Sequence, residues 1–163
     1  MLPEIKTILY ATDLGSGAPY VFRYALSLAQ KHRAQITVLK AMEPLSTFGQ
    51  SLVELHISHS SSEQMHAEAR AQVKAQIKER LHDFCVKEDS VSEENLVADI
   101  RVVEGKPAEV ILAEARSINA DLIVIGSHGH SALGDALLGH TANKLTHRSE
   151  IPLMLIRIPE GFA

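Results

Sequence analysis

The sequence DLIVIGSHGHSALGDALLGHTANKLTHR, residues 121–148, decides the fold and places a binding site. Asp121 to Ile125 form a short apolar run, which is typical of a strand buried on both faces. A glycine-rich loop follows, and Thr141 to Arg148 carry a helical pattern. A strand, a glycine-rich loop and a helix in this order present backbone N–H groups and a positive helix end to an anion. The stretch therefore predicts a phosphate site at the end of a buried strand.

The rest of the chain alternates similar apolar runs with helical patterns. Four further runs predict strands, over residues 7–11, 36–41, 97–103 and 152–156. Between them, apolar residues recur at helical spacing over about 19–32, 62–87 and 107–118. Strands that alternate with helices indicate an α/β protein, with a parallel sheet covered by helices on both faces. The run 97–103 is the least apolar of the strands, so we expect it at an edge of the sheet.

Length and composition predict one domain, residues 1–163. The chain has 163 residues, of which 45% are hydrophobic and 22% are charged, as in soluble globular proteins. Its net charge of −4 argues against a nucleic-acid binder. We expect a cytoplasmic protein without a membrane partner, because the N-terminus lacks a signal-peptide pattern and no apolar run is long enough to span a bilayer. The single cysteine, Cys85, excludes an intramolecular disulfide and has the spacing of a buried helical residue.

Two segments depart from the regular alternation, and one helix is unusually long. Residues 42–61 contain Pro44 and a serine cluster, and they are too long for an ordinary connection. They form either a mobile lid or a partly helical segment. Residues 159–163 are expected to be a loose tail. The long helix, residues 62–87, is expected to be amphipathic, with an apolar face formed by Met65, Ala69, Val73, Ile77, Leu81 and Phe84.

The carboxyl ends of the first and fourth predicted strands are the expected ligand site. In doubly wound sheets, ligands bind beyond the strands where the strand order reverses. The first strand leads into Ala11, Thr12 and Asp13, and the Asp13 carboxylate can accept a hydrogen bond from a ribose hydroxyl or an adenine amino group. Alternatively, Asp13 only caps the turn that follows the strand. Both roles remain open from the sequence.

The fourth strand leads into the glycine-rich loop. Glycine lets a phosphate approach the backbone closely, and three glycines are spaced across the loop. Ser127 and Thr141 can contact phosphate, cap a helix, or do both. The loop residues with the right chemistry are Gly126, Ser127, Gly129, Gly139, His140 and Thr141.

Familiar phosphate-binding and catalytic motifs are absent from the sequence. It contains no G-x-x-x-x-G-K-[ST], no G-x-G-x-x-G and no G-x-S-x-G. No pair of carboxylates stands out as an acid–base couple, so we predict no catalytic residue. None of the nine histidines has the paired spacing of a zinc signature, and a single cysteine adds no second ligand. We therefore predict no metal site.

With these motifs in order, the chain resembles the universal stress protein family. That family carries the pattern G-x2-G-x9-G-[ST] after its fourth strand and an Asp after its first. The matching residues here are Gly126, Gly129, Gly139 and Asp13. Gly105 to Ala108 resemble the start of the family's third helix, and Ile151 to Ile156 resemble its last strand. The resemblance thus covers nearly the whole chain.

The resemblance implies a five-stranded, doubly wound parallel sheet of order 3-2-1-4-5. It also implies a homodimer paired through the fifth strands, Pro152, Leu153, Met154, Leu155 and Ile156. The implied ligand is ATP or AMP, with or without Mg²⁺ and not covalently bound. The implied nucleotide-binding residues are Ala11, Thr12, Asp13 and Ala41 on the adenosine side, with Ile125, Gly126, Ser127, Gly129, Gly139, His140 and Thr141 toward the ribose and phosphates.

His140 departs from the family pattern, which has Ser or Thr at this position. The backbone N–H survives the exchange, and Thr141 can supply a hydroxyl one residue later. A protonated His140 would attract phosphate, whereas the ring could equally fill the phosphate space. Three functions follow: a dimeric stress-response protein regulated by an adenine nucleotide, a dimeric interaction protein that binds no nucleotide, or a slow ATP hydrolase. The intact glycines favour the first.

Overall fold

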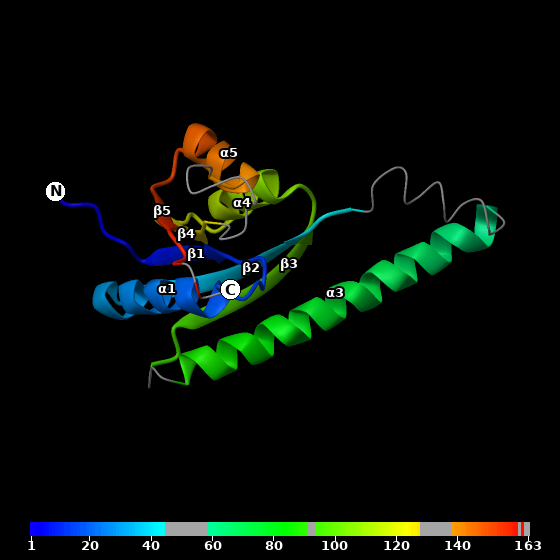
Figure 1. The fold of residues 1–163 in the computed structure, drawn as a ribbon, viewed down its shortest axis with the longest axis horizontal. Helices are drawn as coiled ribbons and strands as arrows, with labels where there is room; N and C mark the ends of the chain where they lie inside the picture. The colour runs from blue at the N-terminus through cyan, green and yellow to red at the C-terminus, as the bar shows by residue number, and fades with distance from the viewer. Residues whose placement is uncertain (45–58, 91–93, 128–137, 160, 162–163) are drawn as a thin grey trace.

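Five strands form one parallel sheet in the order β3-β2-β1-β4-β5, which confirms the predicted fold (Figure 1). The computed structural model describes residues 1–44, 59–90, 94–127, 138–159 and 161. Each strand lies within two residues of its predicted position. The strands are β1 (Thr7–Ala11), β2 (Gln35–Met42), β3 (Val97–Glu104), β4 (Leu122–Gly126) and β5 (Leu153–Ile156).

Helices cover both faces of the sheet, as predicted. Helices α1 (Ala18–His32) and α3 (His59–Asp89) lie on one face, and α4 (Pro107–Ser117) and α5 (His140–Arg148) lie on the other (Figure 1). Side chains alternate between the two faces along each strand. Accordingly, Tyr10 of β1 packs with Phe22 of α1, whereas the neighbouring Leu9 joins the cluster that contains Ile111 of α4.

The order of the strands puts β1 in the centre of the sheet. Residues Thr7 to Ala11 pair with β2 on one side, and Ile8 to Tyr10 pair with β4 on the other. The chain first builds outward to β3 and then returns past β1 to build β4 and β5. The reversal of strand order therefore falls between β1 and β4, where the sequence places its ligand residues.

The long helix forms as predicted, but its apolar face is buried only in the C-terminal part. In its C-terminal part, Leu81 is buried and Ile77 packs against the core. Toward the N-terminus, Met65 is 55% exposed and Val73 is 47% exposed, and Ala69 is exposed as well. The 31 residues of α3 span about 46 Å at 1.5 Å per residue, and the helix extends past the end of the sheet (Figure 1). Periodicity reveals an apolar face but does not say how far a neighbour covers it.

Strand β3 lies at an edge of the sheet, as its weaker apolar pattern predicts. Its Arg101 links this edge to α4, because the guanidinium donates to Asp99 Oδ2 at 2.7 Å and to Glu114 Oε2 at 2.8 Å. Residue 42 ends β2 and residues 59–61 belong to α3, while 45–58 lie outside the described residues, so the lid and partly helical alternatives for 42–61 both stand. The predicted loose tail, residues 159–163, also falls largely outside them.

Among the helices in the described ranges, none combines the length and the apolar character that crossing a bilayer requires.

Candidate functional site

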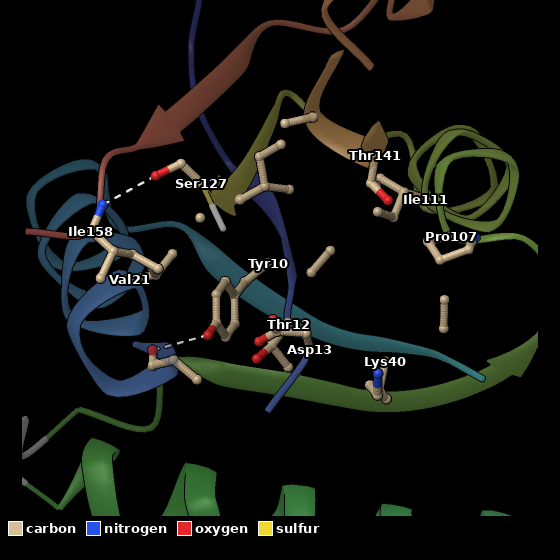
Figure 2. Close-up of a pocket in the computed structure, with 16 residues that line it drawn as sticks. Tyr10, Thr12, Asp13, Val21, Lys40, Pro107, Ile111, Ser127, Thr141 and Ile158 are labelled. Carbon is tan, nitrogen blue, oxygen red and sulfur yellow. Dashed lines mark hydrogen bonds between the residues drawn. The ribbon is translucent and has the colours of Figure 1, made fainter. Parts of the chain in front are cut away.

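A pocket opens where β1, β2 and β4 end, at the reversal of strand order (Figure 2). It contains a cavity of about 120 Å³. All of the residues predicted for the adenosine side line it: Ala11, Thr12, Asp13 and Ala41. From the phosphate side it is lined by Ile125, Gly126, Ser127 and Thr141. The structure therefore brings together residues that are more than a hundred positions apart in the chain.

The remaining predicted residues have different positions. Gly139 is the N-cap residue of α5 and His140 is the first residue of that helix. Neither is among the described residues that line the pocket. Gly129 lies outside the described residues.

The turn after β1 is held by its own side chains. The Leu14 N–H donates to Thr12 Oγ1 at 3.0 Å, and the Gly15 N–H donates to Asp13 Oδ1 at 2.7 Å. This geometry stabilises a positive φ of 60° at Leu14. Asp13 thus caps the turn, which was the alternative interpretation of this residue, and it also lines the pocket. Capping fixes the carboxylate at the pocket wall, so the two roles are compatible.

Tyr10 joins the end of β1 to the start of α1. Its hydroxyl donates to the carbonyl oxygen of Ala18 at 3.1 Å, and its ring stacks on Phe22 with centroids 5.0 Å apart. Burial raises the pKa of Tyr10, so the phenol stays protonated and keeps this donor. The sequence did not reveal this role, because the side chain looks like any other apolar residue in the run 7–11.

The Ser127 hydroxyl holds the chain segment that follows β5. The Ile158 N–H donates to Ser127 Oγ at 3.2 Å (Figure 2). The Ser127 N–H donates to the carbonyl oxygen of Ile156 at 2.8 Å. Ile158 also lines the pocket. No local sequence pattern identifies Ile158 as a pocket residue, because only the tertiary fold brings it to the pocket.

Lys40 is a second residue that sequence reasoning missed. It lies near the end of β2 and lines the pocket with Thr12 and Asp13 (Figure 2). Asp13 and Lys40 are the charged groups among the described lining residues. The sequence contains a signal for this residue, because Lys40 is a charged residue within the apolar run 36–41 and is next to Ala41. The rest of the wall is largely apolar, with Val21, Ile111 and Ile158 around it.

In the part of the chain that the structure describes, the N-terminus of α5 has no side-chain cap and no acidic residue that would compete with a bound anion. Its N-cap, Gly139, has no side chain to cap the helix, and its first turn contains no acidic residue. Thr141 is the second residue of the helix and lines the pocket. The alternative that Thr141 caps a helix is not observed, because Thr141 lies within α5, and within the described residues the Ser127 hydroxyl accepts from the Ile158 N–H. The positive end of the helix dipole therefore lies beside the pocket.

Groups of three or more His, Cys, Asp or Glu side chains that could hold a metal ion are not found within the described residues. The arrangement can bind a ligand that has an apolar ring and an anionic group, but it presents no acid–base pair or activated nucleophile on the described walls.

This fold and this site define a class: doubly wound α/β proteins with a small-molecule pocket at the reversal of strand order. Within it, the chain belongs to the universal stress protein family, whose model matches residues 4–157.

Relatives in the family match this chain over most of their length. A universal stress protein of Thermus aquaticus, encoded in the QAH/OAS sulfhydrylase 3′ region, is 31% identical over 155 residues, which cover 93% of this chain and 98% of the relative. Universal stress protein A homolog 2 of Coxiella burnetii is 28% identical and covers 93% of this chain and 92% of the relative.

Solved structures share the fold at lower identity. The protein MJ0577 of Methanocaldococcus jannaschii superimposes with a TM-score of 0.74 at 21% identity, covering 98% of this chain and all of that one. A universal stress protein in complex with cAMP gives a TM-score of 0.62 at 17% identity, covering 96% of this chain and all of that one. At 21% and 17% identity, the similarity to these two structures shows a shared fold.

Proposed function

We propose that this protein binds an adenine nucleotide, ATP or AMP, in the pocket at the ends of β1 and β4. In this proposal it acts as a single-domain, dimeric stress-response regulator in the cytoplasm. The observation that carries the proposal is the meeting of Asp13 with Gly126 and the start of α5 around one pocket. The solved structure of a family member in complex with cAMP supports the choice of an adenine nucleotide.

The end of the pocket that contains Asp13 suits an adenosine group. A planar base would lie beside the small apolar residues Ala11 and Ala41. Asp13 can accept a hydrogen bond from an amino or hydroxyl group, and Lys40 can donate one to a ring nitrogen or an oxygen. A carboxylate and an ammonium at the same end match a ligand that carries both donors and acceptors.

The opposite end suits phosphate. Gly126 has no side chain, the Ser127 and Thr141 hydroxyls line the wall, and the positive end of α5 lies beside them. His140 is absent from the described lining, whereas Thr141 is present. The hydroxyl that the family places at position 140 is therefore supplied by the next residue in this proposal. This favours binding over blockage by the His140 ring.

Calorimetric titration with ATP, ADP, AMP and cAMP, with and without Mg²⁺, tests the proposal. We expect heat of binding for at least ATP or AMP. The matched pair Asp13→Asn and Asp13→Ala separates the two roles of this residue, because an Asn oxygen can still accept from the Gly15 N–H and keep the turn capped. Both variants should bind more weakly if the charge contacts the ligand. Only Asp13→Ala should lower the melting temperature.

A second set of variants addresses His140 and Thr141. Thr141→Val removes the hydroxyl at nearly constant volume and should weaken ATP binding by about fivefold to tenfold. If millimolar nucleotide gives no heat with the wild type, the proposal fails. If His140→Ser then gains binding, the wild type is a nucleotide-free interaction protein whose site the ring has closed. Steady phosphate release that is lost in Gly139→Val would instead identify a hydrolase.

The dimer is proposed from the bare edge at β5. In the described sheet β5 pairs with β4 alone, and its Leu153, Met154 and Leu155 are only half-buried. Proteins usually cover an apolar edge strand, and a second copy of this chain could add its own β5 there. Sedimentation at micromolar concentration should give a dimer, and Leu155→Lys should give a monomer. A stable wild-type monomer would overturn this part of the proposal.

A further inference from the structure

Ile158 touches the ligand pocket with both its backbone and its side chain. It follows β5 by two residues, and its N–H donates to Ser127 Oγ at 3.2 Å. Its side chain lines the pocket beside Val21 (Figure 2). The family pattern of glycines and Asp13 does not include this position.

The side chain of Ile158 occupies space that two glycines leave open. A Cβ atom at Gly17, the N-cap residue of α1, would come within 2.6 Å of Ile158 Cδ1. A Cβ atom at Gly126, the last residue of β4, would come within 3.3 Å of the same atom. Contacts below about 3.5 Å between carbon atoms lie inside the favourable distance. Ile158 therefore seals the wall between α1 and β4 because both neighbours lack a side chain.

The hydrogen bond from Ile158 determines what the Ser127 hydroxyl can still do. A serine hydroxyl has one donor and two acceptor lone pairs. The Ile158 N–H occupies a lone pair. Within the described residues the Ser127 O–H has no protein acceptor, and Ser127 lines the pocket. Its proton can therefore be donated to an oxygen of a bound ligand.

We propose that Ile158 is a positioning residue of the nucleotide site: its N–H orients the Ser127 hydroxyl as a donor to a ribose or phosphate oxygen, and its side chain closes the wall over Gly17 and Gly126. This inference rests on the proposed nucleotide binding. It extends the site from the ends of β1 and β4 to the segment after β5, which carries no residue of the predicted site.

A double-mutant cycle on Ser127 and Ile158 tests the inference, with ATP affinity measured by calorimetry. Ser127→Ala removes the hydroxyl and should weaken ATP binding by about fivefold to tenfold. Ile158→Pro removes the N–H and keeps an apolar side chain, and should weaken binding by about threefold to fivefold. In the Ser127→Ala background, Ile158→Pro should weaken binding less than it does in the wild-type background, because the part of its effect that acts through the Ser127 hydroxyl is already lost. Independent, additive effects would overturn the inference.

Two further variants control for a misplaced proline. Ile158→Val keeps the N–H but loses Cδ1, the atom nearest to Gly17 and Gly126, so its ATP affinity should lie between those of the wild type and Ile158→Gly. Ile158→Gly keeps the N–H but opens the wall, so it should weaken binding even if Ile158→Pro does not fold. Wild-type affinity in Ile158→Gly would contradict the role of the side chain.

Hydrogen exchange at the Ile158 amide separates this inference from the proposed function. The amide should be protected in the wild type and should exchange faster in Ser127→Ala, with or without ATP. A wild type that binds no ATP would overturn the proposed function and the ligand role of Ile158 together, even if the amide remains protected. A wild type that binds ATP with an unprotected Ile158 amide would overturn the inference alone.

Discussion

Gly126 has a structural reason to be glycine besides the proposed approach of a phosphate. A Cβ atom at this position would meet Val21 Cγ2 at 2.8 Å and Ile158 Cδ1 at 3.3 Å. Val21 is buried in α1, and a β-branched residue in a helix has essentially one rotamer. It therefore cannot turn aside to admit the new methyl group. We expect Gly126→Ala to destabilise the fold in the absence of any ligand.

The magnitude follows from two opposing effects. The distance of 2.8 Å is roughly 0.7 Å shorter than the favourable carbon–carbon separation of about 3.5 Å, and overpacking of this kind costs about 1–3 kcal/mol. Replacing glycine by alanine also restricts the unfolded chain, which returns about 0.4–1 kcal/mol. Overpacking is the larger effect, so the free energy of unfolding should fall by about 1–2 kcal/mol. For a chain of this length that is a drop of about 2–8 °C in melting temperature.

Urea unfolding of Gly126→Ala, Val21→Ala and the double variant isolates the contact. Val21→Ala alone should destabilise the protein by creating a cavity. The double variant should be more stable than the sum of the single effects predicts, because the methyl group added at residue 126 fills part of the space vacated at residue 21. We expect a coupling energy of about 1–2 kcal/mol.

Additive effects of the two substitutions would refute the reasoning, as would a Gly126→Ala protein as stable as the wild type. In either case the packing of α1 against the end of β4 would not constrain Gly126. Unchanged m-values are the control that the unfolded states remain comparable.

Three further predictions concern elements away from the pocket. On α3, Leu81→Ala should lower the free energy of unfolding by about 2–5 kcal/mol, whereas Val73→Ala should change it by less than about 0.5 kcal/mol. Equal urea midpoints for the two variants would contradict the exposure of the N-terminal part of α3. Burial raises the pKa of Cys85 to about 12, so a thiol reagent at pH 8 should react much more slowly with the native protein than with protein in urea, and rapid native labelling would contradict this. The hydrogen bond from Arg101 lowers the pKa of Asp99 in the folded protein. The Asp99 carboxylate therefore stabilises the folded state above its unfolded pKa of about 3.9, and this stabilisation is lost as the pH falls through the lower folded pKa. An NMR titration of Arg101→Met should show the Asp99 pKa back in its usual range, and an unchanged titration would exclude the pair as the cause.

The secondary structure could be predicted from the sequence because its signals are local. Apolar runs marked the strands, and Pro19 and Pro107 marked the starts of two helices. The order of the strands has no such local signal, since periodicity does not say which strands become neighbours. That order came from the resemblance to the family, and the sheet confirms it.

The long helix shows the limit of periodicity. Met65 and Val73 continue the face of Leu81 at intervals of four, so the pattern alone gives no reason to separate them. They differ in the tertiary structure, because Leu81 packs in the core beneath α1 while the N-terminal part of α3 runs beyond the sheet. How far a helix extends past its support depends on the sheet and not on the sequence of the helix.

The pocket was predicted as far as its residues belong to short motifs. Asp13 and Gly126 could be found because each lies within two residues of the end of an apolar run. Tyr10 and Ile158 could not, because each reaches the pocket through a contact with a distant element, Ala18 in one case and Ser127 in the other. A hydrogen bond between residues 31 positions apart leaves no mark on the local sequence.

The central position of β1 has a consequence for how the protein is synthesised. β1 leaves the ribosome before the other four strands of the sheet, and β2 can pair with it soon afterward. Its other edge must remain unpaired until Leu122 to Gly126 emerge, roughly 6–20 s later at about 5–20 residues per second. During that interval Ile8, Leu9 and Tyr10, which are fully buried in the finished sheet, border an open apolar edge. The pocket needs the end of β4 beside the end of β1, so it cannot form until synthesis has passed Gly126.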